Sequence, residues 1–331
     1  MPTDPAPDLE AILADLQMAL AADAAPVASR RRFRPRRRLV LAVPLVLALA
    51  AALFVGLGVG HEQPAAAREL RDAAKLVAGD PAPVIGPGQY WYVKGVGAFA
   101  NAVGSLEPGS SGTSATFVAL QTSSHEIWIA GDSSGRVVRK DGPPQFFSAA
   151  ERARWEAAGK PAFGPDGGID STDPTPGALS FGWESLGVHS RNEIPADPSA
   201  LAALVERAAQ GTKNPLPYEE FQVIEEVLRF APLSGAQTAA FYQVLATLPG
   251  IQLVGPAKDA LGRPGTAFAV DRGDPTRDEL ILDPGTGRLL GSRTTLTRPD
   301  PAYPGAPAGT VLGYETIVST GVVDSTDARP S

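Results

Sequence analysis

The sequence predicts an α+β fold, in which a curved antiparallel sheet packs on helices and is preceded by a single transmembrane helix. Three observations lead to this prediction. A run of 22 residues without charge, 39–60, follows a dense run of arginines. Strand-like segments separated by turns lie on both sides of a block of helical patterns. The regular strand–helix alternation typical of parallel nucleotide-binding sheets does not occur.

The composition excludes several classes of function. The chain has 331 residues, of which 44% are hydrophobic and 20% charged, enough for one large or two ordinary domains. It has no cysteine and only three histidines, which excludes disulfide scaffolds, thiolate catalysis and cysteine-based zinc sites. We therefore expect no cofactor and no metal ion.

Residues 39–60 are long enough to cross a membrane once, because a helix of that length spans about 33 Å against about 30 Å of hydrocarbon. Seven arginines precede the segment, whereas only three basic residues occur in the fifteen positions after it. The excess of positive charge places the N-terminus in the cytoplasm and the C-terminal domain outside the cell membrane. These arginines face anionic lipid, so we expect no nucleic acid as a partner. They are Arg30, Arg31, Arg32, Arg34, Arg36, Arg37 and Arg38.

A cleaved signal peptide is the alternative for the same region. Residues 65–67 are three alanines that fit a cleavage site, and residues 29–33 match the start of a twin-arginine signal. The 38-residue leader and the 22-residue apolar run are both longer than a cleaved signal needs, which favours a permanent anchor. Both routes export the same domain, and they differ in whether it stays tethered.

Residues 1–38 form a cytoplasmic arm with a short apolar stripe. An isolated helix of about 13 residues is marginal in water. The stripe is therefore either part of a frayed leader or a face that folds onto a partner protein. Its residues recur at helical spacing and are Leu9, Ile12, Leu13, Leu16 and Leu20.

Residues 61–80 are predicted as a juxtamembrane helix and residues 81–331 as the extracytoplasmic α+β domain. Helix signals include Asp197-Pro198 as an N-cap followed by proline, and a capping box from Ser234 to Gln237. Residues 143–176 have mostly loop composition apart from the helical stretch 148–158, contain an Asp- and Gly-rich run at 166–173, and are predicted to be mobile. The predicted helices cover 148–158, a segment starting at 197, 218–230 and 234–248. The predicted strands cover 89–93, 115–120, 126–130, 136–139, 251–254, 266–270, 279–282, 288–296 and 311–319, with a turn at 283–287.

No motif in the chain predicts catalysis. Residues 131–135 match the G-x-S-x-G pattern around Ser133, but a strand follows where a nucleophile elbow needs a helix, and His189 is the only downstream histidine. A hairpin turn is the favoured interpretation and a serine hydrolase the remote one. Two further patterns are incomplete. Asp166, Asp170 and Asp173 lack the spacing of a calcium loop, and Gly95-Val96-Gly97 lacks the third glycine of a dinucleotide motif.

Five aromatic residues are candidates to line an apolar pocket beneath the curved sheet. Hydrophobic and aromatic side chains together supply most of the wall of a typical small-molecule site. The alternative is that they belong to the ordinary core. They are Tyr90, Trp91, Tyr92, Trp128 and Trp183.

The chain resembles a family of single-pass actinobacterial membrane proteins that are often encoded beside extracytoplasmic-function sigma factors. The resemblance lies in the order arm, arginine run, membrane helix and alanine-rich helix, and in segments made mostly of turns and caps. These segments are 88–92, 194–201, 248–254, 262–265 and 280–290. The resemblance implies an outer domain of the lipoprotein-carrier type, a half-barrel-like sheet curled over helices, and it implies no catalytic residues.

This resemblance implies a sensor or binding protein at the cell surface. We expect a non-enzymatic protein whose outer domain binds an apolar ligand or an envelope protein, and whose arm contacts a sigma factor. The arm lacks the His and Cys zinc pattern of many anti-sigma factors, and at 38 residues it is shorter than their sigma-binding domain. The alternative from another class is an envelope structural or protein-interaction module without a ligand.

Overall fold

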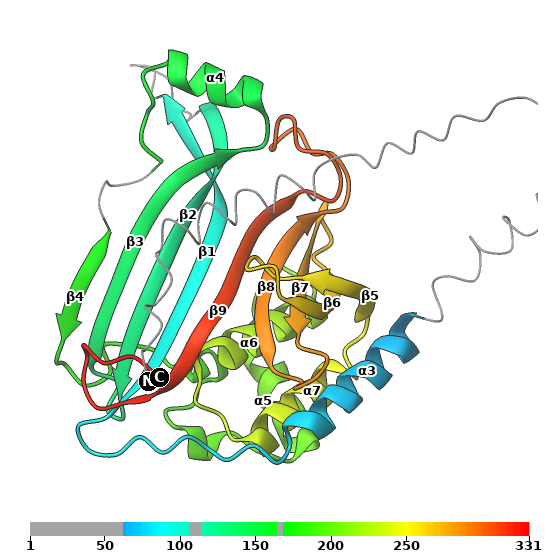
Figure 1. Cartoon of the computed structure of the whole chain (residues 1–331). Helices are drawn as coiled ribbons and strands as arrows, with labels where there is room; N and C mark the ends of the chain where they lie inside the picture. Colours follow the sequence, from blue (N-terminus) through cyan, green and yellow to red (C-terminus); the bar gives the residue numbers. More distant parts are fainter. Residues whose placement is uncertain (1–61, 106–113, 164–167, 331) are drawn as a thin grey trace, which may run out of the picture.

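A computed structural model describes residues 62–105, 114–163 and 168–330. Its centre is a nine-stranded sheet in which every neighbouring pair is antiparallel, in the order β4-β3-β2-β1-β9-β8-β7-β6-β5 (Figure 1). The α+β class and the open curved antiparallel sheet are therefore confirmed. The strands are β1 Tyr90–Ser105, β2 Ser114–Ala130, β3 Gly135–Phe146, β4 Ile169–Asp173, β5 Gln252–Lys258, β6 Pro264–Asp271, β7 Thr276–Leu282, β8 Leu289–Leu296 and β9 Val311–Val323.

Helices α4, α5 and α7 begin at the residues that the sequence predicts, whereas α6 begins at Leu216, two residues before the predicted start and without a side-chain cap. Ser148 caps α4, Asp197 caps α5, and Ser234 forms a capping box with Gln237 at the start of α7. These caps satisfy backbone N–H groups that the first helical turn leaves without partners. The helices are α3 Glu62–Val77, α4 Ala149–Ala157, α5 Pro198–Ala208, α6 Leu216–Phe230 and α7 Gly235–Leu245.

Helices α3, α5, α6 and α7 gather at one end of the sheet, whereas α4 lies at the far tips of β2 and β3 (Figure 1). The main core lies between these four helices and the sheet. Trp91, Val93 and Ile129 enter it from β1 and β2, and Phe221 and Phe241 enter it from α6 and α7. Burying side chains of this size stabilises the fold by about 1.5–3 kcal/mol each. The core therefore anchors α6 against the sheet, and α6 forms one wall of the site described below.

The helix predicted within residues 61–80 is present as α3. Its apolar face, with Ala66, Leu70, Ala74 and Val77, joins the same core as the sheet and α7. Asp80, just after the helix, accepts a backbone hydrogen bond from Gly235 and also pairs with Arg288. The helix is thus an integral part of the packed domain.

The segment 168–173 differs from the mobile loop that its composition predicts. Residues 169–173 form the edge strand β4 and pair with β3. Arg136 on β3 donates to both carboxylate oxygens of Asp170 at 2.9 Å, which supports this edge. Cross-strand ion pairs of this kind stabilise a strand that its composition disfavours.

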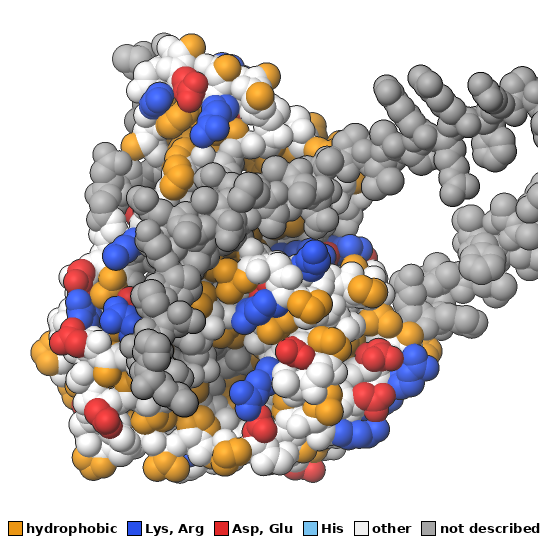
Figure 2. All heavy atoms as spheres, in the orientation of Figure 1, with side chains coloured by type: hydrophobic (Ala, Val, Ile, Leu, Met, Phe, Trp, Pro, Cys, Tyr) orange, Lys and Arg blue, Asp and Glu red, His pale blue; other side chains and the backbone are white. Residues whose placement is uncertain are grey.

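The arm, the arginine run and residues 39–60 lie outside the described residues. Within the described part, none of the helices has the length and apolar character required to span a bilayer. On the face that Figure 2 shows, basic and acidic side chains of the described residues are interspersed over the helical end. An excess of acidic over basic side chains lies in a cleft, which is described next.

Candidate functional site

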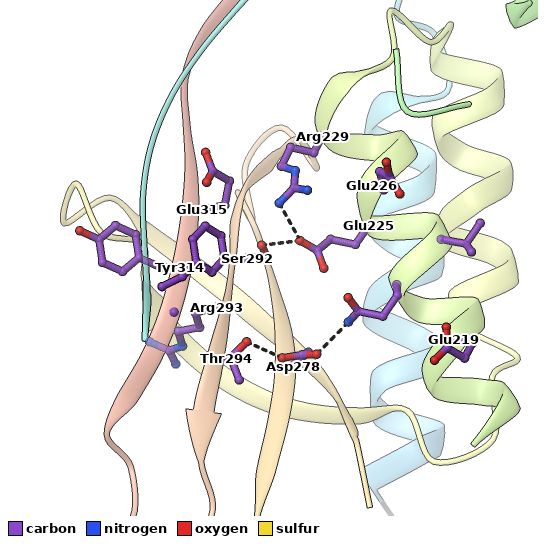
Figure 3. A pocket seen from close by; sticks show the side chains of 14 residues that line it. Glu219, Glu225, Glu226, Arg229, Asp278, Ser292, Arg293, Thr294, Tyr314 and Glu315 are labelled. Atoms are coloured by element: carbon purple, nitrogen blue, oxygen red, sulfur yellow. Dashed lines mark hydrogen bonds and ion pairs between the residues drawn. The ribbon is translucent and has the colours of Figure 1, made fainter. Parts of the chain in front are cut away.

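An open cleft with a volume of about 350 Å³ lies between α6 and the helix-covered face of the sheet, which we call the α6 cleft (Figure 3). Strands β1, β7, β8 and β9 supply one wall and α6 the other. A second cleft of about 300 Å³ shares Phe99, Thr294 and Gly313 with it. Phe99 therefore lies where the two clefts meet, and its side chain is 51% exposed.

Two glycines of β1 create the floor next to this cleft. Gly95 pairs with His125 of β2, and Gly97 pairs with Glu315 of β9. A Cβ atom at Gly97 would lie 2.2 Å from Glu315 Oε2, and one at Gly95 would lie 2.4 Å from His125 Cε1. The absent side chains let the histidine and the glutamate reach toward each other across β1. His125 Nδ1 consequently lies 3.4 Å from Glu315 Oε1.

In the sequence, Gly95-Val96-Gly97 matches only an incomplete nucleotide motif. The structure gives the two glycines a different role, because residues two apart on a strand face the same side of the sheet. Both therefore open space on the face that carries His125 and Glu315. The signal that pointed to this was a pair of glycines inside a strand, which marks close approach of other groups.

Helix α6 brings a second buried carboxylate to the cleft. Glu225 accepts a hydrogen bond of 2.6 Å from the hydroxyl of Ser292, and its Oε1 lies 3.3 Å from Arg229 Nη1 (Figure 3). Arg229 also stacks over Phe230, with 4.7 Å between the guanidinium carbon and the ring centroid. Arg229 is therefore held against Glu225, and its Nε donates no hydrogen bond within the described structure.

Asp278 of β7 connects α6 to the sheet. Its Oδ2 accepts hydrogen bonds of 2.8 Å from Tyr218 and from Gln222 of α6, and its Oδ1 accepts one of 2.6 Å from Thr294 of β8. Three neutral donors thus surround one buried carboxylate. This network sets the distance between the helix and the sheet, and with it the width of the α6 cleft.

Burial shifts the pKa values of the groups around the cleft away from the charged forms. It raises the pKa of Glu315 to about 7, with Arg229 opposing and Glu225 adding to the shift. It raises the pKa of Glu225 as well. Burial, together with the nearby charges of Arg229 and Arg139, lowers the pKa of His125 to about 4. His125 is therefore neutral near pH 7, whereas Glu315 is about half ionised at that pH.

Replacing Glu315 by glutamine is expected to change how stability depends on pH. Between pH 4.5 and 7 the folded protein keeps a proton on Glu315 that the unfolded chain releases. The free energy of unfolding of the wild type therefore falls as pH rises through this window. Glu315→Gln should thus gain about 2–3 kcal/mol relative to the wild type across that window. Urea unfolding of the full chain at a series of pH values measures the difference.

His125→Gln is the matched control, and its slope should have the opposite sign. The folded protein binds fewer protons at His125 than the unfolded chain between pH 4 and 6.5, so the wild type gains stability there as pH rises. The variant lacks that gain and should fall behind by about 2–3 kcal/mol. If the free energy of unfolding changed with pH in the same way in the wild type and in both variants, the burial of Glu315 and His125 without strong ion pairs would be contradicted.

The five aromatic candidates lie in two other places. Trp91 and Trp183 are buried in the main core, where Trp91 Nε1 donates to the carbonyl of Phe230. Tyr92 and Trp128 pack together with Tyr90 on the opposite face of the sheet, and Trp128 Nε1 donates to the carbonyl of Ala328. None of the five is among the residues that line the two clefts described above. Their role in a ligand pocket stays a prediction.

The remaining chemical candidates take ordinary structural places. Ser133 lies in the turn between β2 and β3 with a φ of 63°, and a strand follows it, which is the hairpin that the sequence favours. Asp170 pairs with Arg136. Asp173 accepts a hydrogen bond from the backbone of Thr175. Within the described residues no group of three or more potential metal ligands comes together. The leucine stripe of the arm lies outside the described residues.

Comparisons with known proteins leave the chain without an assigned family. No protein-family model matches it, and no curated protein matches it. Among solved structures it is similar to the Pseudomonas aeruginosa MucA/MucB complex, at 16% identity and a TM-score of 0.25 over 78% of this chain and 58% of that one.

MucB in complex with MucA(peri) and MucB alone give similar values. The TM-score is 0.25 for both, with 16% and 15% identity, and the match covers 56% and 59% of those chains. The chain thus matches somewhat more than half the length of these structures. The resemblance described from the sequence stays a prediction.

Proposed function

We propose that the protein is a non-enzymatic, membrane-anchored binding protein whose ligand site is the α6 cleft. The anchor is residues 39–60, the arm in front of it lies in the cytoplasm, and the described domain lies outside. The arginine run beside an uncharged segment supports this topology. In this arrangement the leucine stripe of the arm is available to a cytoplasmic partner such as a sigma factor.

The observation that carries the proposal is the open α6 cleft with its buried polar groups. Its volume of about 350 Å³ is within the range of small ligand sites, and its wall contains two buried polar atoms without hydrogen bonds, Glu315 Oε1 and Arg229 Nε. Buried polar atoms are normally hydrogen-bonded, so exceptions at one cleft indicate where a ligand or water completes the structure. The polar lining favours a polar ligand group over the apolar ligand that the resemblance implies.

A photo-crosslinking experiment in intact cells tests this proposal. Phe99 is replaced by the photoreactive p-benzoylphenylalanine, because its ring lies at the meeting point of both clefts. Leu76 on α3 is the matched control, since it is 50% exposed against 51% for Phe99 and lines neither cleft. We expect an adduct in the membrane fraction from position 99 and none from position 76.

The adduct should weaken when the cleft is altered. Glu225→Gln changes the cleft wall without touching the crosslinking position, and we expect it to reduce the yield of the adduct at position 99. No adduct at position 99, or equal adducts at both positions, would remove the support for a ligand site in the α6 cleft. A chain found only in the soluble fraction would remove the support for the anchor.

A further inference from the structure

We propose that the α6 cleft binds a cationic nitrogen group of the alkylammonium or alkylguanidinium class, and that Glu315 Oε1 accepts its hydrogen bond. This inference rests on the proposed function, because it assigns a ligand chemistry to the same cleft. It is carried by an unpartnered buried carboxylate oxygen, by an excess of carboxylates around it, and by the apolar ring at the entrance.

The unpartnered atom is the first step. The Glu315 side chain is only 9% exposed, and its Oε1 accepts no hydrogen bond in the described structure. The nearest ring nitrogen, His125 Nδ1, is 3.4 Å away and is not aligned to donate. Leaving such a buried acceptor without a hydrogen bond costs about 1–3 kcal/mol, and more if the acceptor is charged. Oε1 is shielded from solvent in this structure, so a donor recovers this free energy only if it enters the cleft and reaches that atom.

The charge balance decides which donor fits. Five carboxylates line the α6 cleft against two guanidinium groups, and the carboxylates are those of Glu219, Glu225, Glu226, Asp278 and Glu315. Both arginines already have acidic partners, since Arg229 pairs with Glu225 and Arg293 pairs with Glu279. Among the described residues, no Lys or Arg forms an ion pair with Asp278 or Glu315. The cleft is therefore short of positive charge, and a cation is the complementary ligand.

The rim of the cleft suits the stem of such a ligand. Phe99 is exposed at the meeting point of the two clefts, where an alkyl chain or the face of a guanidinium group can contact the ring. The two clefts share three residues, so a chain that bears the cation can continue from one into the other. Figure 3 shows Glu315 on the sheet side and Glu225 on the α6 side of the space between them.

The test measures binding of defined cationic probes to the full chain by titration calorimetry. The first probe is n-butylguanidinium, with neutral n-butylurea as its control. The second is the peptide acetyl-Gly-Arg-Gly-amide, with the citrulline peptide of the same shape as its control. We expect both cations to bind at least tenfold more tightly than their neutral counterparts. Equal binding of cation and neutral control would overturn the proposal.

The pH dependence of binding should follow the ionisation of Glu315. The groups that face this carboxyl are His125 from β2 and Glu225 and Arg229 from α6, while Arg139 acts on His125. A carboxyl with a pKa of about 7 is about one-tenth ionised at pH 6 and about nine-tenths ionised at pH 8. The apparent affinity for n-butylguanidinium should therefore rise about tenfold from pH 6 to pH 8. An affinity that does not change with pH would assign the binding to another group.

Two variants locate the site. Glu315→Gln removes the acceptor charge with little change of shape and should abolish both the preference for cations and the pH dependence. Glu206→Gln on α5 removes the same charge at an exposed position that lines neither cleft, and it should bind the probes like the wild type. Loss of binding in Glu206→Gln equal to that in Glu315→Gln would overturn the assignment of the site.

A second pair of variants tests the cation site without changing Glu315. Gln222 lines the cleft and donates to Asp278. Gln222→Lys places an ammonium group in the cleft and should weaken probe binding at least tenfold, whereas the neutral Gln222→Met should not. Equal affinities in these two variants would contradict the cation site.

The outcomes separate this inference from the proposed function. A crosslink at position 99 without selective binding of either cationic probe would overturn the cation site and leave the α6 cleft as a ligand site. Tighter binding of the arginine peptide than of n-butylguanidinium supports a side chain of a partner protein as the natural ligand. Equal affinities for the arginine peptide and n-butylguanidinium support a free small amine or guanidine as the natural ligand.

Discussion

Replacing Asp278 by alanine is expected to destabilise the protein by about 3–5 kcal/mol. The carboxylate accepts three hydrogen bonds from Tyr218, Gln222 and Thr294, and the residue is 7% exposed. Alanine leaves these three donors without their acceptor in a partly water-excluded place. Because two of the donors are on α6 and one is on β8, the loss also loosens α6 from the sheet. Urea unfolding, followed by tryptophan fluorescence, measures the change.

Two variants show whether the effect comes from this network. Asp278→Asn keeps the shape and one acceptor oxygen, so it should cost clearly less than alanine. Asp132→Ala removes an exposed carboxylate that accepts hydrogen bonds only from Ser134 in the turn after β2, and it should cost less than about 1 kcal/mol. If Asp278→Ala were no more destabilising than Asp132→Ala, the network would not hold α6 in place.

Replacing Gly235 by alanine is expected to cost about 3 kcal/mol. A Cβ atom at this position would lie 2.0 Å from the carbonyl oxygen of Val77 and 2.6 Å from the backbone nitrogen of Asp80. Both are backbone atoms, which cannot rotate away as a side chain can. The end of α3 would have to move from the start of α7, and the hydrogen bond from Gly235 N to the carbonyl of Asp80 would be strained.

Gly79→Ala is the matched control for this joint. Gly79 lies in the same turn after α3, and a Cβ atom there would have no neighbour within 4 Å. We expect a change within about 0.5 kcal/mol, measured by the same urea unfolding. If the two alanine variants were equally stable, the close approach of α3 to α7 would not be required. The expected difference would show that α3 is packed as part of the domain core.

The order of the strand segments was predicted, but the lengths of the strands and the edge strand β4 were not. The alternating pattern around 89–93 and 115–120 marks only parts of β1 and β2, which extend to Tyr90–Ser105 and Ser114–Ala130. Glycines and polar residues interrupt the apolar pattern in these strands, because the helix-covered face there carries the polar cleft and not the core. The Asp- and Gly-rich composition around β4 favours a loop, and the strand forms because it pairs with β3.

The sequence by itself determined the starts of α4, α5 and α7, several turns and the class of the fold. Caps such as Ser148, Asp197 and Ser234 act on backbone groups three residues away, and the turn after Asp283 is closed by its own carboxylate. Interactions of such short range are readable in one dimension. The absence of cysteine likewise needs no structure to exclude whole classes of chemistry.

Only the tertiary structure decided the site. β9 pairs with β1, so the C-terminal strand lies beside the N-terminal hairpin, and this pairing brings Glu315 to within 3.4 Å of His125 across Gly95 and Gly97. No local pattern records which distant strands become neighbours, because strand pairing is selected by the packing of the whole core. The chemistry of the cleft is therefore a property of the sheet order, and the segments that contribute its residues do not indicate it one by one.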